Sequence, residues 1–174
     1  MAEKQKLKDF FARKDISGGY SDHKDDKGGA TMMDVTLSTY TEYCKRKGLP
    51  APTKDNLKKI DYPTWEDIFE VLFWQPCRAD EIKNQVNACI LVSWAWGSGT
   101  TTAIKWMQKA LGLNADGIIG DKTLAALEIA DPFYLCNVRA QRFRDICAAD
   151  KSQEQFLKGW LNRLEKFKSI FLVK

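Results

Sequence analysis

The chain has 174 residues, a formal net charge of +4, 44% hydrophobic residues and 29% charged residues. This length suits one domain with a well-formed core, and the ordinary composition excludes a fibrous or largely disordered protein. The positive charge is mild and spread along the chain, so no nucleic-acid partner is expected. The most apolar run, residues 88–96, is far shorter than the roughly 20 residues of a spanning helix, which predicts no transmembrane segment.

The first 14 residues are basic and lack both an apolar stretch and a small-residue cleavage site, so no secretory signal is predicted. We expect a protein that is cytoplasmic as synthesised and that acts in the periplasm or at the cell wall only through non-classical export. The five cysteines show no CxxC spacing and are interpreted as reduced, mostly buried thiols. His23 has no cysteine or histidine at ligand spacing, so neither a metal nor another cofactor is expected.

The N-terminal half begins with helical periodicity over residues 2–14, which a glycine-rich loop interrupts. The only strand signal lies at residues 31–37. Ser38 is predicted as the N-cap of the next helix, and Gly48 as its stop. This pattern, together with the helical periodicity of the remaining chain, predicts a mainly α fold class with at most a small β-hairpin.

The middle of the chain is strongly apolar. Thr64 and Asp67 resemble a capping box, which predicts a core helix that continues through residue 74. The segment 79–96 is apolar nearly all round, and this indicates a central buried helix that ends at the glycines of residues 97–99.

The C-terminal third reads as helices around one turn. A helix over residues 101–111 is followed by the Asp-Gly turn of residues 116–117 and a further helix. A long helix is expected from Pro132, and Ser152 with Gln155 supplies a predicted capping box for the last one.

The loop of residues 15–37 is the most distinctive stretch of the sequence. It holds two Gly-Gly pairs and several aspartates. Paired glycines allow positive φ angles and close backbone approach, and aspartates beside them favour turns over helix. These features predict a shaped loop rather than a flexible linker.

The spacing of this loop resembles the catalytic loop of the family-108 glycoside hydrolases, lysozyme-like N-acetylmuramidases of the secretion activator protein type. Their pattern is E-G-G-Y, several polar residues, D-x-G-G-A-T and then G-[VI]-T-L. Here residues 18–20, Asp26, residues 28–31 and residues 35–37 fall in register. Residues 106–127 likewise resemble the L-Q-x-x-L-G…D-G-x-x-G-x-K-T-x-x-A pattern of predicted peptidoglycan-binding segments.

The resemblance implies a lysozyme-like fold in one two-lobed domain. Residues 1–97 are expected to form the N-terminal lobe with the catalytic loop, and residues 98–174 the peptidoglycan-binding-like lobe. It also implies a set of site residues. The catalytic positions are Ser17, Asp26, Thr31 and Asp34, and the substrate-binding positions are Tyr20, Ser93, Trp94, Trp96 and Ser98.

Ser17 stands where the resembled family has its catalytic glutamate. Glycoside hydrolysis uses two carboxyl groups, one of which must protonate the leaving oxygen. A serine hydroxyl can hydrogen-bond a sugar but cannot supply that proton near neutral pH. The chain also has Asp34 at the glycine of G-[VI]-T-L, and Ser93 and Gly97 where homologues read D-W-x-x-N-S-G. Several changes at expected cleft positions predict a pseudoenzyme.

Two interpretations of individual residues stay open. Asp22, Asp25, Asp26 or Asp34 could act as a relocated acid, although aspartates in turns usually stay near a pKa of about 4 and shape the turn. The tryptophans of residues 94–96 could stack on sugars, although aromatic residues on an apolar helix are more often core.

Three functions remain in view. The first is a non-catalytic module that binds peptidoglycan, a related glycan or a protein partner. The second is an active muramidase that cleaves the MurNAc-GlcNAc bond with a relocated carboxylate. The third is a structural adaptor of a phage-derived or secretion assembly. The apolar tail of residues 168–174 either binds a protein partner or folds back over its own domain.

Overall fold

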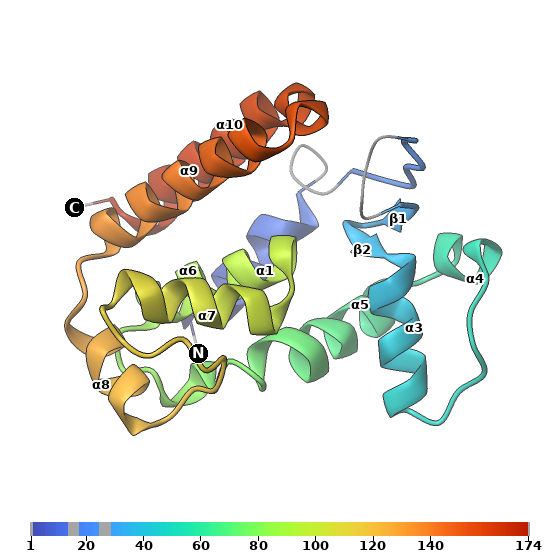
Figure 1. Ribbon diagram of the computed structural model, residues 1–174. Coiled ribbons are helices and arrows are strands. Elements are labelled where there is room, and N and C mark those ends of the chain that lie inside the picture. Colours follow the sequence, from blue (N-terminus) through green and yellow to red (C-terminus); the bar gives the residue numbers. More distant parts are fainter. Residues whose placement is uncertain (1, 14–17, 25–28, 174) are drawn as a thin grey trace. The chain divides into compact units, whose positions relative to one another are not determined.

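The computed structural model describes residues 2–13, 18–24 and 29–173 (Figure 1). The chain packs as two compact units, here called the N-terminal unit (Lys8–Leu72) and the C-terminal unit (Met1–Leu7 with Phe73–Lys174). Helix α1 (Ala2–Ala12) contributes to both. Residue 97, where the boundary between the lobes was expected, lies in the last turn of a helix (α6, Gln85–Ser98) inside the C-terminal unit.

The N-terminal unit combines a small hairpin with short helices. After α1 its elements are β1 (Thr31–Met32), β2 (Val35–Thr36), α3 (Leu37–Arg46), α4 (Lys54–Lys58) and α5 (Tyr62–Phe69). The strands are antiparallel, with Thr31 opposite Thr36. A cluster of rings fills the core, since Trp65 stacks on Phe69 at 5.8 Å and Phe11 meets Phe69 edge-on at 6.3 Å between centroids. The expected small hairpin is confirmed.

The N-cap of α3 is Thr36, so the prediction of Ser38 is wrong by two residues. Thr36 ends β2 with an extended backbone (φ −74°, ψ 157°), and its hydroxyl accepts the N–H of Thr39 at 3.1 Å. Ser38 already lies in the first turn. The strand delivers the chain to the helix without a connecting residue, because the extended strand conformation is also the one that an N-cap requires.

The cap of α5 is Asp61, and the capping box predicted at Thr64 and Asp67 does not form. Asp61 accepts the N–H of Thr64 at 3.0 Å, and Pro63 occupies the first turn. Proline is favoured there because the first N–H groups of a helix have no helical partner. The capping box in this region instead joins Thr53 and Asn56 at the start of α4.

The predicted core helix is not α-helical throughout. It changes at Glu70 to the π-helix η1 (Glu70–Trp74). The C-terminal unit continues with η2 (Ala79–Glu81), α6 (Gln85–Ser98), α7 (Thr100–Ala110), α8 (Asp121–Ile129), α9 (Pro132–Ala149), η3 (Lys151–Gln153) and α10 (Glu154–Phe171). The helix expected from residue 79 thus begins at Gln85, after a short 3₁₀ turn. Asn84 caps it by accepting the N–H of Asn87 at 3.3 Å.

Helix α6 forms the centre of the C-terminal unit, as its composition predicted. Every residue from Asn87 to Trp96 is buried. Figure 1 shows α7 beside α6 and the hairpin of α9 and α10 along one side of the unit, and α6 packs on both α7 and α9. The buried Asn87 amide donates to the carbonyls of Leu127 (2.7 Å) and Ala130 (2.9 Å), which ties the end of α8 to the core.

The chain end folds partly onto its own unit. Phe171 is buried, stacks on Phe167 with centroids 4.3 Å apart and has the Lys6 ammonium 5.1 Å from its ring. Val173 remains 73% exposed. In place of the capping box predicted at Ser152 and Gln155, the chain makes the 3₁₀ turn η3, whose cap Asp150 accepts the N–H of Ser152 at 3.1 Å. Helix α10 then begins after Gln153 without a side-chain cap bond.

All five cysteines are free and buried, which confirms their interpretation as buried thiols. No helix among the described residues is long and apolar enough to cross a membrane.

Candidate functional site

The glycine-rich loop is closed by backbone pairing. The N–H of Ser21 donates to the Thr31 carbonyl at 2.9 Å, and the reverse bond measures 2.7 Å. Gly18 and Gly29 have φ angles of +64° and +68°, so two of the glycines in the motif occupy a conformation that glycine adopts readily. Ser17, Asp25 and Asp26 lie outside the described residues. The described part of the loop is the shaped segment that the sequence predicted.

The hairpin turn explains the glycine of the G-[VI]-T-L pattern. Met33 and Asp34 connect β1 to β2 with φ angles of +49° and +67°. Two positive φ angles at the centre of a two-residue hairpin define a type I′ turn, which favours glycine at its second position. Asp34 holds that position, and aspartate is one of the few residues that tolerate it. The indole N–H of Trp65 donates to the Met33 carbonyl at 3.3 Å and supports the turn.

Helix α4 anchors the first half of the loop through two cations. The Lys54 ammonium lies 2.8 Å from the Asp22 carboxylate, and the Lys58 ammonium lies 4.6 Å from the centre of the Tyr20 ring. The hydrogen bond from Lys54 to Asp22 raises the pKa of Lys54. Tyr20 is 37% exposed, so part of its ring remains open to a ligand.

Among the described carboxyl groups, the resolved pKa shifts run opposite to the shift that a general acid of glycoside hydrolysis needs. Four of these groups have a clearly shifted pKa: Asp61, Asp67, Glu81 and Asp116. In all four the pKa is lowered, chiefly by hydrogen bonds from Thr64, Lys47, Arg78 and the backbone of Ile118, respectively. A general acid needs the opposite shift.

The predicted substrate-binding residues of α6 lie mostly in the core. Ser93 is 4% exposed, Trp94 2% and Trp96 8%. The Trp96 ring packs on Phe73 with centroids 4.7 Å apart, and the exposed Ser98 donates its hydroxyl to the Trp94 carbonyl at 2.8 Å. Their burial supports the core interpretation of the two tryptophans, because a side chain covered to this extent offers no ring face to a sugar.

Sequence reasoning missed the partner of Ser93, which is Arg139 on α9. Arg139 is 8% exposed, and its guanidinium donates from Nη1 to the Ser93 hydroxyl (2.7 Å) and from Nη2 to the Ser93 carbonyl (3.0 Å). Burial, followed by repulsion from Arg163, lowers the pKa of Arg139 to about 9. An available signal was the position of this arginine on a helix face that it shares with the apolar Cys136 and Phe143.

Gln108 organises the Asp-Gly turn of the C-terminal unit. The buried amide donates to the Asp116 carboxylate (2.8 Å), the Ile118 carbonyl (2.9 Å) and the Thr123 hydroxyl (3.2 Å), and it accepts the N–H of Gly117 at 2.9 Å. A hollow of about 460 Å³ lies at this turn. Since the motif residues bond to one another, their spacing is explained by the fold of the turn.

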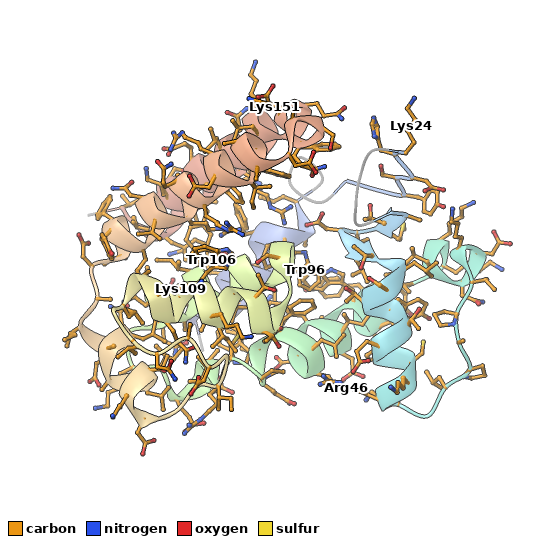
Figure 2. All side chains as sticks on the ribbon, viewed as in Figure 1. Lys24, Arg46, Trp96, Trp106, Lys109 and Lys151 are labelled. Carbon is orange, nitrogen blue, oxygen red and sulfur yellow. The ribbon has the colours of Figure 1, made fainter. Side chains whose placement is uncertain are left out.

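A half-buried aromatic and cationic surface lies on α7 and α9. The Arg142 guanidinium is 3.8 Å and the Lys109 ammonium 4.3 Å from the Trp106 ring centre, and Figure 2 shows Trp106 and Lys109 on α7. Within the hairpin of α9 and α10, Phe143 and Trp160 lie 5.4 Å apart. Aromatic faces next to cations suit a glycan that carries negative charge.

Residues 15–99 match the family model of Glycosyl hydrolase 108, and residues 102–165 match that of the Predicted Peptidoglycan domain. The solved structure of Brucella abortus SagA is similar, with 28% identity, a TM-score of 0.80, and coverage of 98% of this chain and 94% of that one. No curated protein matches the chain. The likeness confirms the expected fold class, mainly α and lysozyme-like with a small hairpin.

Proposed function

We propose that this chain, which joins a glycosyl hydrolase 108 domain to a predicted peptidoglycan domain, binds peptidoglycan and does not cleave it. The observation that carries the proposal is Ser17, which stands at the glutamate position of the loop pattern. A positioned general acid contributes roughly 10²–10⁴-fold to such reactions, and a hydroxyl cannot replace it.

The described carboxylates give little support to a relocated acid. Asp22 forms an ion pair with Lys54, with 2.8 Å between the carboxylate and the ammonium. Asp34 occupies the backbone position of a turn glycine, which accounts for its departure from the pattern without a catalytic role. Loss of the acid with retention of the loop favours binding as the remaining activity of the N-terminal unit.

The surface around Trp106 is our candidate for glycan contact in the C-terminal unit. Its ring is half-buried and flanked by Arg142 and Lys109 at 3.8 Å and 4.3 Å. Peptidoglycan presents sugar rings and carboxylates on one polymer, and this cluster pairs an aromatic face with two cations. A protein partner at the C-terminal tail has less support, because Phe171 is packed into the core and Val173 is the exposed member among the apolar residues of the described tail.

A sacculus pull-down tests this proposal with matched variants. Trp106→Ala and Arg142→Ala should each lower the bound fraction several-fold, whereas Phe133→Ala, which removes an exposed aromatic at the start of α9, should leave it unchanged. Equal binding by all three variants would refute the Trp106 surface. Absence of wild-type binding would refute peptidoglycan as the partner.

A further inference from the structure

The buried guanidinium of Arg139 has no carboxylate partner among the described residues. Its two hydrogen bonds to described residues both go to Ser93, which is neutral. A guanidinium has five N–H donors, and the buried Nε of Arg139 has no hydrogen-bond partner in the described part of the chain. Buried charges in proteins are normally paired, so this cation is an exception that needs an explanation.

The groups that surround Arg139 do not neutralise its positive charge. Arg163 on α10 is near enough for its charge to lower the pKa of Arg139, which nevertheless stays well above neutrality at about 9. The Phe143 ring, 5.5 Å from the guanidinium carbon, offers only the weak attraction of an aromatic face. The Ser93 hydroxyl accepts from Arg139 and donates to the Ile90 carbonyl at 3.0 Å, so it adds no negative charge.

Gly97 leaves room beside this cation. It is exposed on α6, and a Cβ built on it would lie 3.9 Å from Nη2 of Arg139, which is ordinary van der Waals contact. The guanidinium therefore lies directly beneath a surface position that has no side chain.

We propose that Arg139 and Ser93 form a binding site for a carboxylate group, which approaches past Gly97 and pairs with the guanidinium. A planar group with two oxygens matches the fork of N–H donors on arginine. The group can belong to a small free carboxylate or to a peptide of the cell wall, and only the second source rests on the proposed function.

Thermal unfolding of the whole chain tests the site with acetate as the probe. Sodium acetate should raise the wild-type melting temperature by about 1–3 °C over sodium chloride at the same ionic strength and neutral pH. Ser93→Asp, which places a carboxylate against Arg139, should raise the melting temperature in chloride by a similar amount and abolish the acetate effect. Gly97→Asp supplies the carboxylate from the other side and covers the case in which Ser93→Asp does not fold.

The control is Thr102→Asp, which adds the same charge at an exposed position of α7 and should keep the full acetate effect. An acetate effect that survives in both Ser93→Asp and Gly97→Asp, or its absence from the wild type, overturns the site. A parallel titration with soluble wall peptides and with uncharged chitin oligomers identifies the source. Because acetate needs no glycan, failure of wall binding and failure of this site are separate results.

Discussion

Two turns with positive φ angles, one in each unit, differ in how their sequence matches their shape. In the C-terminal unit, Gly117 has φ +78° and its N–H is held by Gln108 at 2.9 Å. In the N-terminal unit, Met33 and Asp34 have φ +49° and +67° without a glycine. The first turn has glycine at its position of positive φ, which that geometry favours. The hairpin turn of the N-terminal unit instead has left-handed backbone angles at two residues that are not glycine.

The largest loss of stability should come from removing the Gln108 side chain, which forms the hydrogen bonds of the Asp-Gly turn in the C-terminal unit. Gln108→Ala leaves the Gly117 N–H and three other polar partners without their buried bonds. We expect a loss of about 3 kcal/mol, or a melting temperature lower by about 6–12 °C. Gln141→Ala, at an exposed residue that bonds Asp145 at 2.9 Å, is the control and should change little. Equal effects would show that the turn holds without Gln108.

The next largest loss of stability should come from changing the glycine of the same turn. Gly117→Ala forces a side chain into positive φ and places its Cβ 3.2 Å from atoms of both Lys105 and Thr101. The expected cost is about 1–2 kcal/mol in urea unfolding. Gly159→Ala is the control and should not destabilise the protein, because Gly159 lies inside α10 and its added Cβ meets nothing within 4 Å. A neutral Gly117→Ala would mean that the glycine is not needed for the fold.

The N-terminal unit joins α3 to α5 through a charged bond network. Asp67 accepts from Lys47 at 2.7 Å and from the Tyr43 hydroxyl at 2.6 Å, and these bonds lower its pKa. Because the folded pKa lies below the unfolded value of about 3.9, the stabilisation is full above that value and is lost as pH falls through the folded pKa. With the carboxyl partly exposed, Asp67→Asn should cost no more than about 1 kcal/mol at neutral pH.

The difference in stability between this variant and the wild type should shrink between neutral pH and about pH 2, as the Asp67 carboxylate takes up a proton. Asp55→Asn is the control, because Asp55 is 84% exposed and lies 3.9 Å from Lys58. A cost of Asp67→Asn that does not change with pH would contradict an ionic contribution. Urea unfolding at both pH values measures it.

The smallest predicted effect is a gain in stability from changing Asp34 in the hairpin turn. Asp34→Gly restores the residue that a type I′ turn favours and should stabilise the protein by about 0.5 kcal/mol, whereas Asp34→Ala should destabilise it. The sign of the difference between the two variants decides the matter in a thermal unfolding experiment. If both variants lose stability equally, the Asp34 side chain supports the fold through its own contacts and the glycine comparison fails.

The sequence predicted the architecture well where periodicity and glycine spacing determine it. The apolar run of α6, the Asp-Gly turn before α8 and the hairpin near residue 31 all appear as expected. Helix caps were misplaced at Ser38, Thr64 and Ser152, because several hydroxyl and carboxyl residues stand close together and tertiary context selects one. The presence of a capping residue near each of these positions was therefore more predictable than its exact place or the type of cap.

The site was less predictable. Resemblance named Ser93 as a contact for substrate, but only the packing of α6 on α9 brings it to the buried Arg139, 46 residues away in sequence. No periodicity within one helix reveals such a pair. The sequence also shows that Asp34 departs from the family pattern, but not why glycine is favoured at that position. The reason is the positive φ angle of the turn, which only the structure shows.

The most direct test of binding without cleavage is to incubate the protein with purified sacculi and to measure the released muropeptides by mass spectrometry. We predict that the wild type and Ser17→Ala stay bound and release nothing above the buffer control. Ser17→Glu should release little, because Asp34, Ser93 and Gly97 also depart from the family pattern and small errors in position are costly. Release of muropeptides by the wild type at a rate that Ser17→Ala does not change would contradict the proposal and place the acid elsewhere in the chain.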